Sequence, residues 1–324
     1  MDKKKFLPTL AFLIPLALYP ILISFNNYFL NVGTFIVIYA TIVAAWNIIC
    51  GFAGQLDLGA GAYMGMGIFI TGILLLWWNI TPLIGIIVGG LATAALGFVI
   101  GYPTFRFGVR EVWYALSSLA LVSILQKLFL VWEQVAGPVE RRLPYFSGEW
   151  YLMRFYNFSV YFYMSLALLI ITLLLNVKIR YSKIGYYLLA IRENEEAAEM
   201  LGVDVRKYKL LALLIYSFIV GLTGGIFVLI AGYYHPSLFD PWVSIQTAIL
   251  GIVGGLGAIY GAPLTALIIL GIQEYLRFTL GGIVQGLHLI VYAVILILVV
   301  LFKPEGLSEV FRSIYKKAVA LKAK

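Results

Sequence analysis

The sequence predicts an all-α integral membrane protein, a polytopic bundle of about eight to ten transmembrane helices. Of its 324 residues, 62% are apolar and only 12% are charged, whereas soluble domains carry about 25% charged residues. A helix needs roughly 20 apolar residues to cross the bilayer, so this composition supplies about ten crossings and excludes a soluble enzyme or a disordered chain. The apolar residues form continuous runs, which excludes an outer-membrane barrel of alternating strands.

Ten continuous apolar runs in the sequence give the predicted transmembrane helices. The first run follows three lysines and contains prolines, but no small-residue cleavage site follows it, so we interpret it as a retained helix. Two features leave the count open: the glycine-rich segment 51–59 is alternatively re-entrant, and the last pair of short runs before 284 are alternatively half-helices. The predicted spans are 6–25, 29–50, 59–78, 82–104, 112–132, 158–177, 208–231, 243–259, 263–280 and 284–302.

The basic residues predict the orientation of the bundle. With both termini in the cytoplasm, 18 of the 23 lysines and arginines fall on the cytoplasmic side, as the positive-inside rule requires. The net charge of +8 is therefore a topology signal, and we expect no nucleic-acid partner. The chain is expected to form a single transmembrane domain, 1–324, with an external loop at 133–157 and a long cytoplasmic loop at 178–207.

The sequence lacks the usual signatures of an enzyme. It has no nucleophile elbow, no HExxH and no P-loop, and its two histidines have no metal-ligand spacing. We therefore expect no catalytic, cofactor or metal site, and any use of ATP must involve another chain.

Charged residues at membrane depth are costly and mark functional candidates. Glu274 and Arg277 lie three apart on the ninth run, on one helix face, where they can pair. Lys127 and Arg277 can alternatively reach the outer interface by snorkelling. Asp57, in the glycine-rich segment, is either a structural cap for the next helix or a residue of a transport path.

Glycine pairs at small-xxx-small spacing, such as Gly221/Gly225 and Gly251/Gly255, predict close helix packing. This packing is generic to helical bundles and does not by itself indicate a transporter.

The cytoplasmic segment 188–202 is the most informative part of the sequence. It predicts one amphipathic helix of about 14 residues that ends at Gly202 in a left-handed turn. Arg192 is expected to meet Glu195 or Glu196 one turn on. Membrane-surface helices favour basic polar faces, whereas this one is acidic, which favours docking on another protein. The residues expected to share its apolar side are Leu188, Ile191, Ala198 and Leu201.

These residues resemble the coupling helix of ABC-importer permeases, in which Glu-Ala-Ala is followed after three residues by Gly. Four further blocks, in the expected order, are similar to the LivM-type permeases of branched-chain amino acid importers, although this family usually has Ser where Asp57 stands. The blocks are Gly51-Phe52-Ala53-Gly54-Gln55-Leu56, Gly221-Leu222-Thr223-Gly224, Gly254-Gly255-Leu256-Gly257 and Phe302-Lys303-Pro304-Glu305-Gly306-Leu307.

The resemblance implies the partners and the functional residues. This chain would be one of two different permease subunits in the plasma membrane of a prokaryote, with two ABC ATPase subunits beneath it and an extracytoplasmic binding protein above it. ATP would be used by the ATPase subunits alone. The residues implied for ATPase coupling are Ile191, Arg192, Glu195, Glu196, Ala197, Ala198, Glu199 and Gly202. The candidates for the translocation path are Gly54, Gln55, Asp57, Gly59, Gly224 and Gly255.

Three functions remain open from the sequence. The first is the permease half of an ATP-driven importer of branched-chain (aliphatic) amino acids. The second is an ABC permease for urea, short amides or another small polar solute. The third is a secondary carrier driven by an ion gradient, although no series of acidic residues runs through successive spans.

Overall fold

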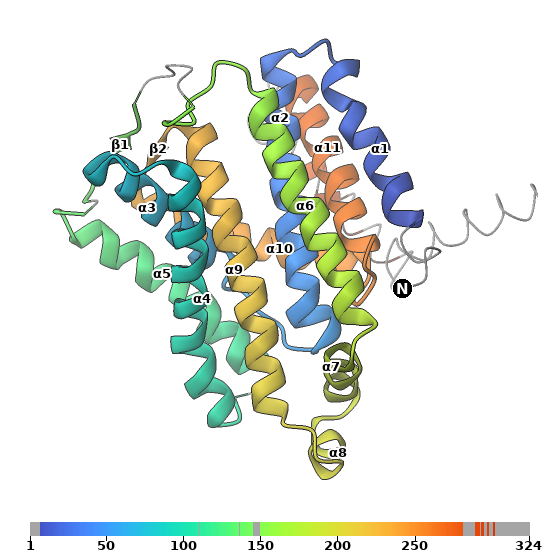
Figure 1. Ribbon diagram of the computed structural model, residues 1–324. Coiled ribbons are helices and arrows are strands. Elements are labelled where there is room, and N and C mark those ends of the chain that lie inside the picture. Colours follow the sequence, from blue (N-terminus) through green and yellow to red (C-terminus); the bar gives the residue numbers. More distant parts are fainter. Residues whose placement is uncertain are drawn as a thin grey trace, which may run out of the picture.

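The protein is described by a computed structural model of residues 7–109, 111–135, 137–144 and 150–280, with 289–291, 293–294, 297 and 301. These residues form a bundle of long helices (Figure 1). Its lower end, in the view of Figure 1, carries α7 and α8, and its upper end carries the short strands β1 and β2. The elements are α1 (Leu7–Leu22), α2 (Asn27–Trp46), the π-helix η2 (Asn47–Phe52), α3 (Ala60–Trp78), α4 (Pro82–Arg106), α5 (Glu111–Val131), β1 (Arg141–Arg142), α6 (Ser159–Arg180), α7 (Lys183–Glu193), α8 (Glu195–Met200), α9 (Val205–Ala231), β2 (Tyr233–Tyr234), the 3-10 helix η3 (Pro236–Leu238), α10 (Pro241–Gly254) and α11 (Gly261–Leu280).

Six helices in the described part of the chain are long and apolar enough to cross a membrane, judged by length and composition. They are α2 with η2, α3, α4, α5, α6 and α9. The prediction of an all-α polytopic protein is therefore confirmed.

Most predicted spans coincide with observed helices, because each continuous apolar run must close its own backbone hydrogen bonds in lipid. The predicted span 243–259 is wrong in length: α10 has only 14 residues, about 21 Å at 1.5 Å per residue, which is shorter than the roughly 30 Å hydrocarbon core. The predicted last span, 284–302, and the basic termini lie outside the fully described segments.

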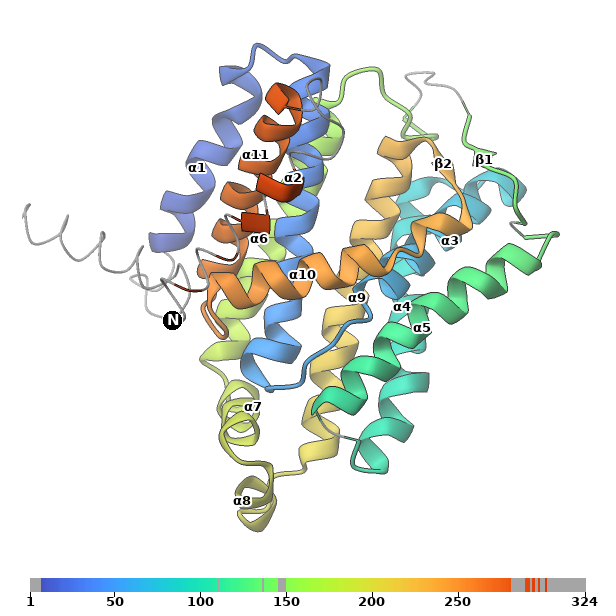
Figure 2. The ribbon, with the colours of Figure 1, turned by 180° about the vertical axis from the view of Figure 1, so that it is seen from behind.

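The helices form two groups. One group contains α3, α4 and α9, and the other contains α2, α6 and α11 with α1 alongside, while α10 runs across between them (Figures 1 and 2). The first group packs backbone against backbone: a Cβ on Gly67 would lie 2.1 Å from Gly221 O, and one on Gly224 would lie 2.2 Å from Met64 O. Only glycine fits at these crossings, so the predicted glycine packing is confirmed.

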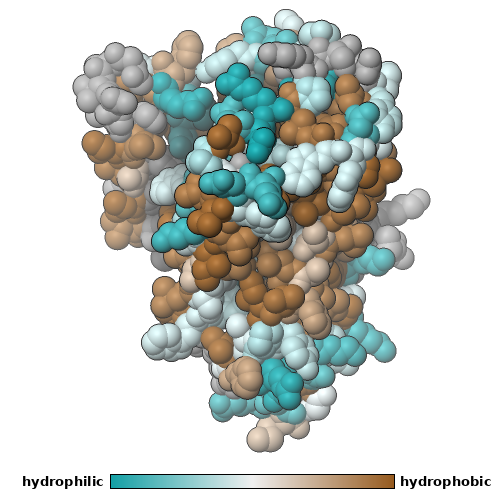
Figure 3. All heavy atoms as spheres, turned by 90° about the vertical axis from the view of Figure 1, so that its left-hand side faces the viewer, coloured by the Kyte–Doolittle hydropathy of each residue, from teal (hydrophilic) through white to brown (hydrophobic). Residues whose placement is uncertain are grey.

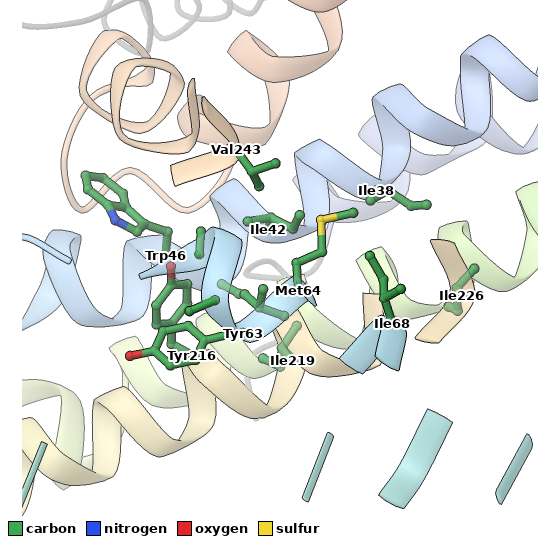
Figure 4. Close-up of a cluster of buried hydrophobic side chains, with 14 of the residues drawn as sticks. Ile38, Ile42, Trp46, Tyr63, Met64, Ile68, Tyr216, Ile219, Ile226 and Val243 are labelled. Atoms are coloured by element: carbon green, nitrogen blue, oxygen red, sulfur yellow. The ribbon is translucent and has the colours of Figure 1, made fainter. Parts of the chain in front are cut away.

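The large interior of the bundle is apolar. Side chains from α2, α3, α9 and α10 interlock in one cluster (Figure 4), whose members include Ile42, Met64, Ile219 and Val243. The outer surface is apolar as well. On the face shown in Figure 3, hydrophobic side chains gather across the middle, with hydrophilic ones towards the two ends. This distribution fits a bilayer around the middle of the bundle.

The upper end is tied together across a long separation in sequence. β1 pairs with β2 in antiparallel register, with Arg141 opposite Tyr234. Arg154 donates through Nε to Pro144 O at 3.0 Å and through Nη1 to Leu229 O near the end of α9. The described parts of the loop 133–157 are therefore anchored to the bundle.

Candidate functional site

The segment from Lys183 to Gly202 protrudes from the lower end of the bundle (Figure 1). Each of its two helices begins with a side-chain cap: Ser182 accepts a hydrogen bond from Gly185 N, and Asn194 accepts one from Ala197 N. Such caps satisfy backbone N–H groups that have no partner within the helix. At the end of α8, Gly202 has φ +82 and Val203 N donates to Ala198 O, so the left-handed turn predicted at Gly202 is confirmed.

Two expectations about the helical extent and the burial of this segment are wrong. The single helix predicted over 188–202 is divided at Asn194, whose extended backbone (φ −162, ψ 112) separates α7 from α8. Leu188, Ile191 and Ala198 are buried as expected, but Leu201 is 83% exposed. The residue lies beyond the last turn of α8, so helical spacing no longer places it on the buried side.

Two cationic side chains join the α7–α8 segment to the residues that follow α2, which are the π-helix η2 and the glycine-rich segment. Arg192 Nη1 donates to Gly51 O at 2.7 Å, rather than pointing along the acidic helix as predicted. Lys209, at the start of α9, donates to Gln55 Oε1 at 2.8 Å and also to Glu195 Oε1 on α8. Lys209 is 3% exposed, so these contacts lie inside the protein. Sequence analysis missed Lys209, and only its charge next to an apolar run could have drawn attention to it.

The glycine-rich segment 53–59 is non-helical and returns from the lower end of α2 to the start of α3 (Figure 2). Other elements satisfy its backbone: Trp46 Nε1 donates to Asp57 O at 2.8 Å, and Ser118 Oγ accepts from Leu58 N at 2.9 Å. The first turn of α3 is held in the same way, because Gly61 N donates to Ser244 Oγ at 2.9 Å. Irregular backbone within a membrane bundle needs such partners.

Asp57 is fully buried in this segment. Its Oδ1 accepts from Gly59 N at 2.7 Å, and its Oδ2 accepts from the Tyr114 hydroxyl at 2.9 Å. The rings of Tyr63 and Tyr216 meet edge to face (Figure 4), and their buried hydroxyls have no hydrogen-bond partner among the described residues. The hydrogen bond from Gly59 N, directly before α3, agrees with the interpretation of Asp57 as a cap for this helix.

The other residues predicted for the path lie apart from one another. Gly54 is exposed and borders Arg192, while Gln55 is buried against Lys209. Gly224 lies where α9 crosses α3, and Gly255 ends α10. Gly54, Gln55, Asp57 and Gly59 are thus together in one segment, whereas Gly224 and Gly255 belong to helix packing and a helix end.

The comparison with known proteins identifies the family. Residues 28–300 match a family model described as the permease component of the branched-chain amino acid transport system. This chain belongs to that family. The resemblance drawn from the sequence is therefore confirmed, and the chain is a multi-pass membrane protein.

Two relatives illustrate the similarity. The high-affinity branched-chain amino acid transport system permease protein LivM of Escherichia coli (strain K12) is 25% identical, over 93% of this chain and 74% of LivM. The corresponding protein LivH of the same organism is 26% identical, over 83% of this chain and 90% of LivH. No solved structure matches the chain.

Proposed function

We propose that this chain is one of two different permease subunits of an ATP-driven importer of branched-chain amino acids. It would lie in the plasma membrane of a prokaryote, with both termini in the cytoplasm. Two ABC ATPase subunits would bind at its lower end and an extracytoplasmic binding protein at its upper end. ATP would be bound and hydrolysed by the ATPase subunits, so that this chain itself needs no cofactor and catalyses no reaction. The family of the chain and its similarity to the transport permeases LivM and LivH support this proposal.

The observation that carries the proposal is the protruding α7–α8 segment with its two links, through Arg192 to Gly51 of η2 and through Lys209 to Gln55. The tip of the segment presents Met200 and Leu201, which are 90% and 83% exposed, beside the exposed Glu196 and Glu199. An apolar centre with an acidic rim suits a groove on another protein, whereas an anionic membrane surface would repel it.

The links give this surface a mechanical role. If an ATPase subunit pushes α8, Glu195 moves with it and displaces Lys209, which in turn holds Gln55. A push on α7 would likewise be passed to Gly51, because Arg192 of α7 donates a hydrogen bond to the Gly51 carbonyl. Each charge-assisted hydrogen bond contributes about 1.5–3 kcal/mol, so these bonds can hold η2 and the glycine-rich segment to the moving α7–α8 segment.

The distribution of cations supports this orientation. Eight of the 13 lysines and arginines in the described part of the chain lie at the lower end, as the positive-inside rule expects of a cytoplasmic face. Those that belong to the lower end are Arg106, Lys178, Arg180, Lys183, Arg192, Arg206, Lys207 and Lys209.

Reconstitution in liposomes tests the proposal. The chain alone should move no leucine, with or without an ion gradient. Addition of the sister permease, the ATPase subunits and the binding protein should give ATP-dependent leucine uptake. Uptake by the chain alone under an ion gradient would replace the proposal with a secondary carrier, and ATP-dependent uptake of urea but not leucine would replace the substrate.

A further inference from the structure

A cavity of about 380 Å³, with both polar and apolar lining, lies near the upper end of the bundle, among α2, α9, α10 and α11. Its volume falls in the range of small-molecule pockets, roughly 300–1,000 Å³. The cavity is about one helix length away from the links to α8, because Asn31 and Val32 line it near the start of α2, whereas Gly51 lies at the far end. Nothing in the coupling segment contributes to it.

Polar groups from three helices converge on this cavity. Glu274 and Arg277 of α11 form an ion pair at 2.8 Å, as the sequence predicted. Gln246 Nε2 of α10 donates to Gln273 Oε1 of α11 at 3.1 Å. Asn31 Oδ1 of α2 is buried and accepts no hydrogen bond from the described residues. Snorkelling accounts for a lone cation near an interface but not for this convergence. Buried polar atoms usually have a hydrogen-bond partner, so the unsatisfied Oδ1 of Asn31 is a candidate contact for a bound ligand.

The remaining wall of the cavity is apolar. Val32 of α2, Phe227 of α9 and Leu270 of α11 line it. The side chains of Glu274 and Arg277 are 27% and 55% exposed, so a ligand can reach both charges. The cavity therefore offers a cation, an anion and an aliphatic surface within one small volume.

We propose that this cavity is a binding site for the zwitterion of an aliphatic amino acid. Arg277 binds the carboxylate and Glu274 binds the ammonium group, while the aliphatic side chain lies against Val32, Phe227 and Leu270. The amides of Gln246, Gln273 and Asn31 supply the remaining hydrogen bonds. This inference rests on the proposed function, because it names the substrate class that such a permease would carry.

The paired charges select a zwitterion over other small solutes. Glu274 and Arg277 neutralise each other in the empty site, and a zwitterion supplies a counter-charge to each when it separates them. An aliphatic amine or a carboxylic acid supplies only one counter-charge, so it makes one ion pair where the zwitterion makes two and leaves Arg277 or Glu274 without a charged partner. Urea carries no charge and cannot compensate for opening the ion pair, so the site disfavours the amide alternative.

Direct binding tests this site. Radiolabelled leucine is titrated into the assembled permease–ATPase complex without the binding protein, and saturation is measured by scintillation proximity. Unlabelled isopentylamine, 4-methylpentanoate and urea are used as competitors. We expect saturable leucine binding, competition at least tenfold weaker by each of the three analogues, and leucine affinity at least tenfold lower in Arg277→Gln and Glu274→Gln.

A matched control and a folding readout make the result decisive. Lys127→Gln removes an exposed cation of α5 that does not line the cavity, and it should keep leucine affinity within twofold. Size-exclusion chromatography checks that each variant assembles. Gln273→Glu provides a second test: it adds a negative charge next to the proposed position of the ligand carboxylate and should lower leucine affinity at least tenfold. Unchanged affinity in the assembled variants, or equal competition by isopentylamine, would overturn the inference. A complex that takes up leucine with ATP but shows no saturable binding would overturn this site and leave the proposed function intact, whereas loss of wild-type uptake would count against the function itself.

Discussion

Replacement of Lys209 by methionine tests whether α8 is mechanically joined to the glycine-rich segment. Methionine keeps an apolar chain of similar length but removes the ammonium group that donates to Gln55 Oε1 and Glu195 Oε1. The free-energy cost of losing the hydrogen bond then differs between the two acceptors. Gln55 is 1% exposed, so an unpaired Oε1 there costs about 1–3 kcal/mol. The side chain of Glu195 is 23% exposed, so water screens part of its loss and we add only about 1 kcal/mol.

The expected total is therefore about 2–4 kcal/mol, of which a part appears as lost coupling. Since 1.4 kcal/mol corresponds to a factor of ten, we expect Lys209→Met to lower the leucine transported per ATP hydrolysed at least tenfold, while ATP hydrolysis continues. The assay measures uptake and phosphate release in parallel on the reconstituted complex. Gln55→Leu should produce a similar loss, and the double variant should be little worse than either single one, because both remove the same contact.

Lys207→Met is the matched control, since Lys207 is exposed two residues earlier on the same helix. It should transport as the wild type does. If Lys209→Met retains the wild-type ratio of transport to hydrolysis, the link between α8 and the glycine-rich segment carries no force and the reasoning fails.

Three further predictions concern the same region. Gly257→Ala places a Cβ 2.9 Å from Arg192 Nη1 at a φ of +80, and we expect it to reduce transport per ATP severalfold. The control is Gly108→Ala, at φ +69 with open space around it, which has the same backbone cost of about 1–2 kcal/mol without the clash and should transport normally. Equal effects of the two variants on transport would argue against a role for the Arg192 contact. Glu196→Arg should lower ATPase association, measured by co-purification, while the chain still inserts; undiminished co-purification would remove α8 from the docking surface. Asp57→Asn keeps the acceptor for Gly59 N but loses the charge, and it should change leucine transport more than thermal stability; a loss of folded protein alone would leave Asp57 with a purely structural role.

The sequence predicts helices better than it predicts their ends and breaks. Continuous apolar runs locate α2 to α6, α9 and α11 because lipid permits few alternatives to a helix. The break between α7 and α8 was missed, although Asn194 followed by two glutamates is a recognisable helix start, with a capping side chain and acidic residues in the first turn. That signal was outweighed by an apolar pattern that continues across it.

The contacts of the site lie beyond sequence reasoning for a different reason. Lys209 and Gln55 are separated by 154 positions, and no local pattern records that the start of α9 packs beside the end of α2. The Glu274–Arg277 pair is local and was predicted from its spacing. Its neighbours in the cavity, Gln246 and Asn31, come from other helices and required the fold.

Arg192 lies between the two proposed sites, the α7–α8 docking surface and the upper cavity, in the sense that it contacts elements connected to both. Its Nη1 bonds to Gly51 at the end of α2, and the backbone of Gly257, in the turn between α10 and α11, lies against the same guanidinium. Gly257 N in turn donates to Asn47 Oδ1 in the π-helix at 2.9 Å, and π-helical turns are common at functional sites. Arg192 thus contacts the π-helix that follows α2 and the turn that joins α10 to α11. The helices α2, α10 and α11 are three of the four that line the upper cavity. A displacement of α7 would reach the cavity if these helices shift as rigid bodies, without a separate chain of contacts through the core.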